Sequence, residues 1–390
     1  MGAKGDGGAP RASESADRVA AHRFPTSSVS VESHRDVAAI ADEWDDLADR
    51  VGASPFLRSG WYQAFTDAFL REGFEVVALR REGRLIALLP LHVRHRSLRS
   101  STNEHTPEFG VIAERPEAAQ ILAEALFDRC PRSVYFEMLG VETGLHELDA
   151  AARAAGYRTI VRTTLRSPYV EIRDGWASYR ASVGRKTRHE VNRLLRRLRA
   201  HGHASFEVYN GDERLEELLA EGFQLEASGW KADERTAIVS QPETLQFYRD
   251  IARWATELGV LRLAFLRLDG RPLAFSLGLE HAGVYYVLKG GYDPTFRCYA
   301  PGILLRHELL ARAFAEGLAR YEFLGADEPW KLAWTSTTHE RFRFVAYASS
   351  ATGLARWATA RYARPLAARL RALARNRRQA LAAGRTKERG

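Results

Sequence analysis

The stretch Val284–Glu316 reads VYYVLKGGYDPTFRCYAPGILLRHELLARAFAE. The apolar run 284–289 predicts a buried strand, and the glycines after it predict a loop that ends at 300–302, before an amphipathic helix. Proline is tolerated in the first helical turn because its missing N–H would have no partner there. Gly302 lets another group approach the backbone closely. Free N–H groups and the positive dipole end of this helix therefore predict an anion site that suits a pyrophosphate.

An earlier part of the chain repeats this order of elements. Glu82-Gly83 and Asp269-Gly270 each separate two strand-like runs, as in tight hairpins, and the two hairpins align at an offset of 187 residues. At an offset of 185, residues 136–140 (FEMLG) align with residues 321–325 (YEFLG), and a helical pattern precedes each of these strands. Two unrelated α/β segments with common hairpin chemistry are the alternative. Duplication accounts better for two matches in the same order.

The two repeats differ at the predicted anion site. At the offset of 185, Pro301 aligns with Pro116, whereas Gly302 aligns with Glu117. A carboxylate in the first turn complements the helix dipole, but it repels a phosphate. The sequence therefore predicts one functional site per chain, in the second repeat.

A longer pattern resembles a known family. Tyr292-Asp293-Pro294, then 300–302, then 321–331 and Trp334 resemble the GNAT-superfamily acetyltransferases of the CelD (cellulose biosynthesis) and BioF-like type, which are related in fold to FemAB peptidyltransferases. The resemblance covers residues 179–346 well and the first half weakly. It implies an α/β (α+β) fold of two tandem GNAT units, with mixed central sheets flanked by helices and a basic helical tail.

The resemblance also implies an activity. An acyl-CoA, most commonly acetyl-CoA, would lie between the strands 284–289 and 321–324, with its pyrophosphate on the helix that begins at Gly302. An amine or hydroxyl of a small-molecule or glycan acceptor, such as a polysaccharide precursor, would attack the thioester directly. Such a reaction needs a base and donors for the developing oxyanion. A Fem-like transferase that uses aminoacyl-tRNA and a non-catalytic scaffold at the inner membrane are the alternatives.

The repeat and the family resemblance together indicate the site residues. The predicted catalytic residues are Lys331, Asp327 and Tyr292. The predicted cofactor-binding residues are Leu288, Lys289, Arg297, Ala300, Pro301, Gly302 and Ile303. The predicted substrate-binding residues are Arg185, Arg188, Trp230 and Glu328. Each catalytic prediction has an alternative without function. Asp327 and Glu328 are then a solvated pair in a loop, Lys331 is a surface lysine, and Tyr292 is an aromatic residue at the end of a strand.

Charge and composition add expectations about partners and location. The net charge of +8 is concentrated in residues 353–390, with eleven Arg or Lys and one Glu, and in residues 179–201, with eight and one. Residues 179–201 predict a basic helix. Residues 353–390 predict an amphipathic helical tail that suits either an anionic membrane surface or packing on the body of the protein. Scattered histidines and two cysteines, Cys130 and Cys298, predict no metal site and no disulfide framework. We expect a cytoplasmic protein, peripheral on the inner membrane at most, that does not bind nucleic acid unless tRNA is the donor.

The expected organisation has four parts. Residues 1–27 form a disordered tail, residues 28–165 a degenerate GNAT-like domain, residues 166–350 the GNAT acyltransferase domain, and residues 351–390 the basic helical tail.

Overall fold

The described strands form one continuous sheet. The computed structural model describes residues 29–211, 214–228 and 237–363, and its 13-stranded sheet has the order β1-β2-β3-β4-β6-β13-β7-β12-β11-β10-β9-β8, with β5 paired to β3. The strands are β1 (Val29–His34), β2 (Phe74–Arg81), β3 (Arg84–Arg94), β4 (Ser97–Ser100), β5 (Ile112–Ala113), β6 (Ser133–Leu139), β7 (Arg158–Glu171), β8 (Ala204–Tyr209), β9 (Leu261–Leu268), β10 (Arg271–His281), β11 (Val284–Tyr292), β12 (Arg320–Glu322) and β13 (Thr338–Tyr347).

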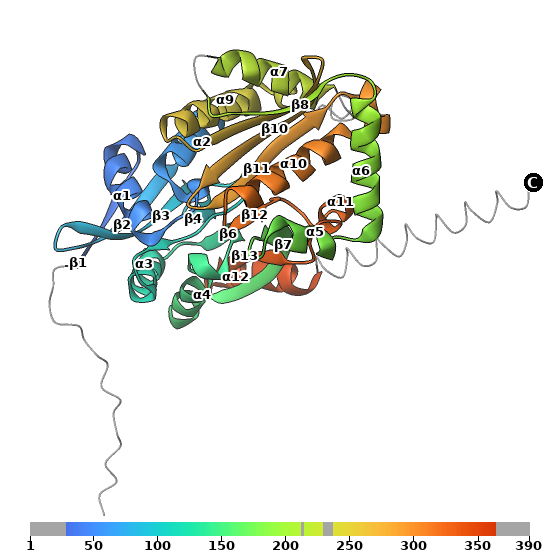
Figure 1. Ribbon diagram of the computed structural model, residues 1–390. Coiled ribbons are helices and arrows are strands. Elements are labelled where there is room, and N and C mark those ends of the chain that lie inside the picture. Colours follow the sequence, from blue (N-terminus) through green and yellow to red (C-terminus); the bar gives the residue numbers. More distant parts are fainter. Residues whose placement is uncertain (1–28, 212–213, 229–236, 364–390) are drawn as a thin grey trace, which may run out of the picture.

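Helices cover both faces of this sheet (Figure 1). The helices are α1 (Ala41–Val51), α2 (Ser59–Phe69), α3 (Pro116–Asp128), α4 (Leu145–Ala154), α5 (Trp176–Ser182), α6 (Arg185–Arg199), α7 (Leu215–Ala227), α9 (Pro242–Glu257), α10 (Pro301–Ala315), α11 (Pro329–Leu332) and α12 (Ala351–Ala358). Short 3₁₀ helices span η1 (Ala38–Ile40), η2 (Pro55–Leu57), η3 (Val141–Thr143), η4 (Ile238–Ser240) and η5 (Pro294–Tyr299), and a π-helical turn spans Thr359–Ala363.

The two faces have different cores. On one face, α1, α2, α7 and α9 share a single core that runs across both halves and contains Trp44, Trp61 and Phe247. On the other face each half has its own core: α3 and α4 cover the first half, and α5, α6 and α10 cover the second. Each strand contributes apolar side chains to the cores on both faces, because successive residues point to opposite sides of a sheet.

The predicted duplication is confirmed. Both hairpins, β2–β3 and β9–β10, turn through two residues with positive φ: Glu82 (54°) and Gly83 (80°), and Asp269 (48°) and Gly270 (81°). In both halves a helix that begins at a proline, α3 or α10, follows the hairpin and precedes the next strand. The predicted mixed sheets flanked by helices are also confirmed, because β4–β6 and β11–β12 are parallel pairs among antiparallel ones.

The two halves share strands at their junction. β13, the last strand of the second half, pairs antiparallel with both β6 and β7, so it lies beside strands of the first half. β7 pairs with β13 as far as Pro168, and its last residues, Tyr169–Glu171, pair with β12. The boundary expected between residues 165 and 166 therefore falls inside one continuous strand.

Two local expectations were wrong. The basic segment 179–201 is not one helix, because α5 ends at Ser182 and α6 begins at Arg185, after Gly184. The glycines after Lys289 do not begin a loop but continue β11 to Tyr292. A Cβ on Gly291 would lie 2.4 Å from the Cα atom of Glu226, so glycine lets α7 pack directly on the strand.

Parts of the predicted organisation lie outside the described residues. These are the tail at residues 1–27 and the basic tail beyond residue 363. In the ranges that the structure describes, no helix combines the length and the apolar character needed to cross a membrane.

Candidate functional site

β11 and β12 part in the middle of the second half. Their parallel ladder joins Val284–Tyr286 to Arg320–Glu322 and goes no further. β12 ends because Leu324 (φ 54°) and Gly325 (φ 62°) take left-handed conformations that turn the chain away. β11 continues, and the register with β10 skips Leu288 in a β-bulge. Bulges re-aim side chains and often lie beside active sites. We call the place where the two strands diverge the β11–β12 gap.

The start of α10 lies open beside this gap. Its N-cap residue, Ala300, has a left-handed conformation (φ 45°) and makes no side-chain cap. A Cβ on Gly302 would meet one heavy-atom neighbour within 4 Å, Cδ1 of Tyr292 at 3.7 Å. Pro301 is buried and anchors the turn. The structure thus brings together Tyr292, Ala300, Pro301 and Gly302, and leaves room over the helix start for an anion.

Lys331 lies at the other side of the gap. Its side chain is buried, and Nζ donates to the carbonyl oxygens of Leu324 (2.7 Å) and Ala326 (2.9 Å). It also forms an ion pair with Glu328 at 3.1 Å. Burial lowers the pKa of Lys331, and the hydrogen bond and charge of Glu328 act in the opposite direction. A buried ammonium group at this place holds the loop after β12 and puts positive charge beside the gap, while Asp327 and Glu328 are exposed.

The sequence did not single out Arg306, which lies on α10. Its Cζ atom lies 3.9 Å from the centroid of the Trp330 ring, a close cation–π contact. Burial lowers the pKa of Arg306. Within the described ranges no carboxylate lies within ion-pair distance of it. An arginine in this setting has unused donors near the site.

The other predicted cofactor-binding residues are more dispersed. The bulge directs Leu288 and Lys289 to the face opposite α10, where Lys289 Nζ lies 5.2 Å from the ring centroid of Tyr248. Of these two residues only the main-chain atoms, and not the side chains, can therefore contribute to a site on the α10 side of the sheet. Arg297 is exposed in η5, and Ile303 packs against the core beneath α10.

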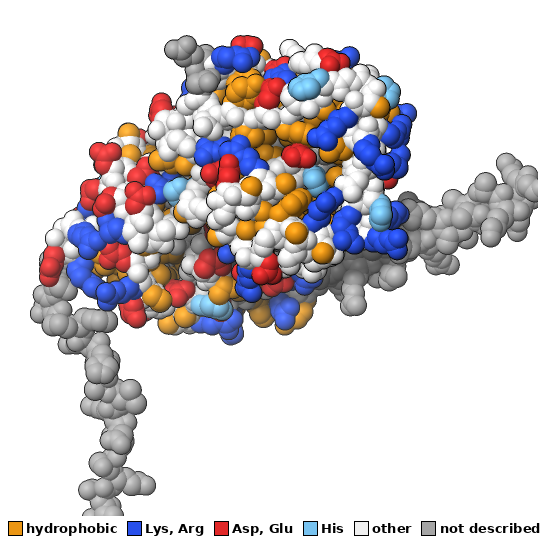
Figure 2. All heavy atoms as spheres, in the orientation of Figure 1, with side chains coloured by type: hydrophobic (Ala, Val, Ile, Leu, Met, Phe, Trp, Pro, Cys, Tyr) orange, Lys and Arg blue, Asp and Glu red, His pale blue; other side chains and the backbone are white. Residues whose placement is uncertain are grey.

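The predicted substrate-binding arginines lie on α6. This helix packs beside α10 and η5, and Lys and Arg side chains gather over it in Figure 2. Arg197 lies 5.3 Å from the ring centroid of Tyr299, in the 3₁₀ helix that leads into α10. Arg185 is exposed, whereas Arg188 is half-buried beside His307 and Trp334. Trp230 lies outside the described residues.

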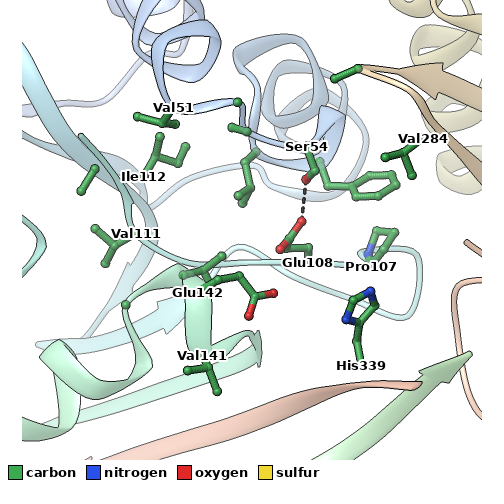
Figure 3. A pocket seen from close by; sticks show the side chains of 18 of the residues that line it. Val51, Ser54, Pro107, Glu108, Val111, Ile112, Val141, Glu142, Val284 and His339 are labelled. Carbon is green, nitrogen blue, oxygen red and sulfur yellow. Dashed lines mark hydrogen bonds between the residues drawn. The ribbon is translucent and has the colours of Figure 1, made fainter. Parts of the chain in front are cut away.

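A pocket of about 630 Å³ opens where the two halves meet, on the face of the sheet opposite α10. We call it the central pocket. Leu324, at the end of β12, is part of its wall. Figure 3 shows Glu108, Glu142 and His339 directed into this space, with Ser54 Oγ donating to Glu108 at 2.5 Å. Its charged lining residues are Glu108, Glu114, Arg115, Glu142, Glu147, Arg320, Glu322 and Arg341, together with His281 and His339.

Several carboxylates of the pocket are held by arginines. Arg341 bridges Glu108 (3.3 Å) and Glu142 (2.6 Å). Burial alone would lower the pKa of Arg341, but the charges of Glu108 and Glu142 outweigh it, and the pKa is raised. Burial, followed by the charges of Glu108 and Glu322, raises the pKa of Tyr286. The pocket wall therefore mixes apolar side chains with carboxylates, whose oxygens are hydrogen-bond acceptors.

Glu322 and His339 form a pair that no local sequence pattern indicates. His339 Nε2 lies 2.9 Å from Oε1 of Glu322, and the imidazole stacks on Tyr169 at 4.1 Å. The two residues come from β12 and β13, which are not neighbours in the sheet. In the described residues, no group of three or more His, Cys, Asp or Glu side chains is arranged to hold a metal ion.

Comparisons with known proteins give a domain match in the second half and a likeness in fold. Residues 185–332 match the family described as the Acetyltransferase (GNAT) domain. The C-terminal domain (DUF2156) of a protein named as a lysylphosphatidylglycerol synthetase from Agrobacterium fabrum is 13% identical, with 82% of this chain and 95% of that chain covered and a TM-score of 0.52. The structure of FemX is 14% identical, with 80% and 96% covered and a TM-score of 0.54. No curated protein matched the sequence. At these identities the two structures show the fold alone.

Proposed function

We propose that the second half is an acyl-CoA-dependent acyltransferase, with acetyl-CoA as its most common donor. The observation that carries the proposal is the open start of α10 beside the β11–β12 gap. Backbone N–H groups and the helix dipole suit the donor's diphosphate there. The match of residues 185–332 to the acetyltransferase (GNAT) domain supports the same donor.

The two faces of the sheet suggest the two substrate routes. The donor approaches on the α10 side, and the acceptor approaches from the central pocket, so that they meet in the gap near Leu324. There main-chain N–H groups favour the developing oxyanion, and the ammonium group of Lys331 holds the loop that borders the gap. Carboxylates in the pocket wall favour an acceptor with amine or hydroxyl groups. An amino sugar or a polysaccharide precursor has this chemistry, and such an acceptor fits the resemblance to the CelD and BioF-like acetyltransferases.

The test is thermal unfolding with and without acetyl-CoA. At about 100 times the dissociation constant the donor adds about 2.7 kcal/mol, which raises the midpoint by about 5 °C. Gly302→Glu copies Glu117 of the first half and should abolish the shift, whereas Gly302→Ala, which adds only a Cβ with 3.7 Å to its nearest neighbour, should retain most of it. Equal shifts for Glu and Ala would refute the proposed donor site.

A second donor is favoured by one observation, the basic face of α6 beside α10. A long anionic donor such as aminoacyl-tRNA would use these arginines through its phosphates. Retention of the protein on immobilised tRNA and not on immobilised CoA would favour this Fem-like alternative.

A further inference from the structure

Glu322 lies where the strands part. It is the last residue of β12 in the ladder with β11. Its neighbours Tyr321 and Phe323 pack into the core beneath α10, so the Glu322 side chain points to the opposite face, into the wall of the central pocket. Only 4% of the residue is exposed. A buried carboxylate needs partners, and Glu322 has two, His339 at 2.9 Å and Arg320 at 3.4 Å.

The ring of His339 is held from two sides. It is nearly parallel to Tyr169, with an interplanar angle of 10°, and Nε2 is bound to Glu322. Since a carboxylate accepts hydrogen bonds, Nε2 carries the proton of the neutral imidazole and Nδ1 keeps its lone pair. In the part of the chain that the structure describes, Nδ1 has no hydrogen-bond partner. Figure 3 shows the imidazole directed into the pocket, toward Pro107 and Glu108.

We propose that His339 is the general base of the transfer and that Glu322 is its positioning residue. This inference rests on the proposed acyl transfer. The acceptor nitrogen or oxygen forms a bond to the thioester carbonyl carbon, and the carbon–sulfur bond breaks. The acceptor's proton passes to Nδ1 of His339, and CoA leaves as the thiolate. The carboxylate of Glu322 stabilises the imidazolium that results.

The position of the base follows from the strand pairing. His339 lies on β13 opposite Ser167 of β7, and Glu322 lies on β12 opposite Tyr169 of the same strand. β7 therefore brings the two side chains together although neither strand pairs with the other. The base is supplied by the strand at the junction of the halves, outside the segment 185–332 that matches the acetyltransferase domain.

The experiment measures CoA thiol release from acetyl-CoA, with glucosamine as the probe acceptor and also with water alone. His339→Ala should lower the rate by about 10²-fold, the lower end of the range for general-base catalysis. Added imidazole should restore part of this rate, because it can occupy the space of the missing ring. Glu322→Gln should lower kcat about tenfold with KM for acetyl-CoA unchanged, and Glu322→Asp should recover part of the loss. His203→Ala, an exposed histidine on the far edge of the second half, is the control.

Folding and donor binding are checked by the thermal shift with acetyl-CoA, which His339→Ala should retain. A rate within twofold of the parent, or a loss that imidazole does not relieve, would overturn the assignment of the base. A parent that binds acetyl-CoA but releases thiol to neither nucleophile would overturn it too, because a base beside the thioester activates water. A parent that shows no shift with acetyl-CoA would instead remove the acyl transfer itself.

Discussion

The two halves have the same hairpins and the same proline-led helix, yet they differ at the positions that border the proposed donor site. At the offset of 185, Gly302 corresponds to Glu117, Arg306 to Ile121 and Lys331 to His146. The first half has a carboxylate and a packed apolar side chain at the positions where the second has an opening and a cation. Under the proposed function, the first half keeps the fold without the site, through a few residues on one helix and one loop.

The same comparison shows where the halves are not separate. They share the core under α1, α2, α7 and α9, and β13 completes the sheet of the first half. The residues that differ between the halves therefore bear on the proposed site, whereas the shared core and β13 bear on the stability of the fold.

The largest effect is expected for Phe344→Ala. This side chain lies on β13 but is completely buried in the core of the first half, beside Phe136. The change should cost about 3–5 kcal/mol, as for other buried phenylalanines. Urea unfolding gives the loss, and hydrogen exchange should rise in β6 and α3. Phe342→Ala, half-buried on the same strand, should cost less. Unchanged protection of β6 would contradict the shared-sheet interpretation.

A middle-sized effect is expected from pH at the contact between the halves. His105 of the first half packs against Phe247 and Tyr248 of α9, and burial, followed by the charge of Lys289, lowers its pKa to about 4. The unfolded chain then binds more protons than the folded one between pH 6.5 and 4, so this stability is present above pH 6.5 and is lost as the pH falls.

Between pH 7 and pH 5 the free energy of unfolding that is lost through His105 amounts to about 2 kcal/mol. The free energy of unfolding from urea titrations should fall by this much more in the parent than in His105→Gln, which does not titrate. An equal fall in both proteins would show that His105 is not the group that responds.

The smallest effect is expected for Arg306→Ile, which copies Ile121 into the second half. Removing a half-buried cation that has no ion-pair partner among the described residues should raise the stability of the free protein by up to about 1 kcal/mol. The affinity for acetyl-CoA should fall about tenfold, or about 1.4 kcal/mol, if the unused donors of Arg306 serve the donor molecule. Calorimetric titration and urea unfolding measure the two changes, with Arg306→Lys as the control. Unchanged affinity would make the residue part of the core only.

Local chemistry made much of the fold predictable. Glu82-Gly83 and Asp269-Gly270 mark their hairpins because few residue pairs adopt two successive positive φ angles. Pro116 and Pro301 mark their helices because proline suits the first turn. The repeat then gave the order of elements in both halves. The open start of α10 was predictable from Pro301 and Gly302 and from their counterparts in the repeat, whereas the parting of β11 and β12 was expected only from the family resemblance.

The junction was not predictable in this way. Nothing in the sequence of β13 shows that it inserts between β6 and β7, because strand partners distant in sequence leave no local pattern. His339 is one of twelve histidines without informative spacing, and Glu322 reads as a strand residue. Their proximity depends on the insertion of β13. Arg306 was missed because an arginine on an amphipathic helix is usually solvated.

The insertion of β13 also affects how the protein can be made by a ribosome. Folding during synthesis normally proceeds domain by domain from the N-terminus. Here β6 and β7 are translated long before the strand that fills the space between them. Until β13 emerges, each presents an unpaired edge of the kind that invites pairing with other chains. The nascent first half must wait for nearly the whole polypeptide, which makes this a slow, high-contact-order folding step.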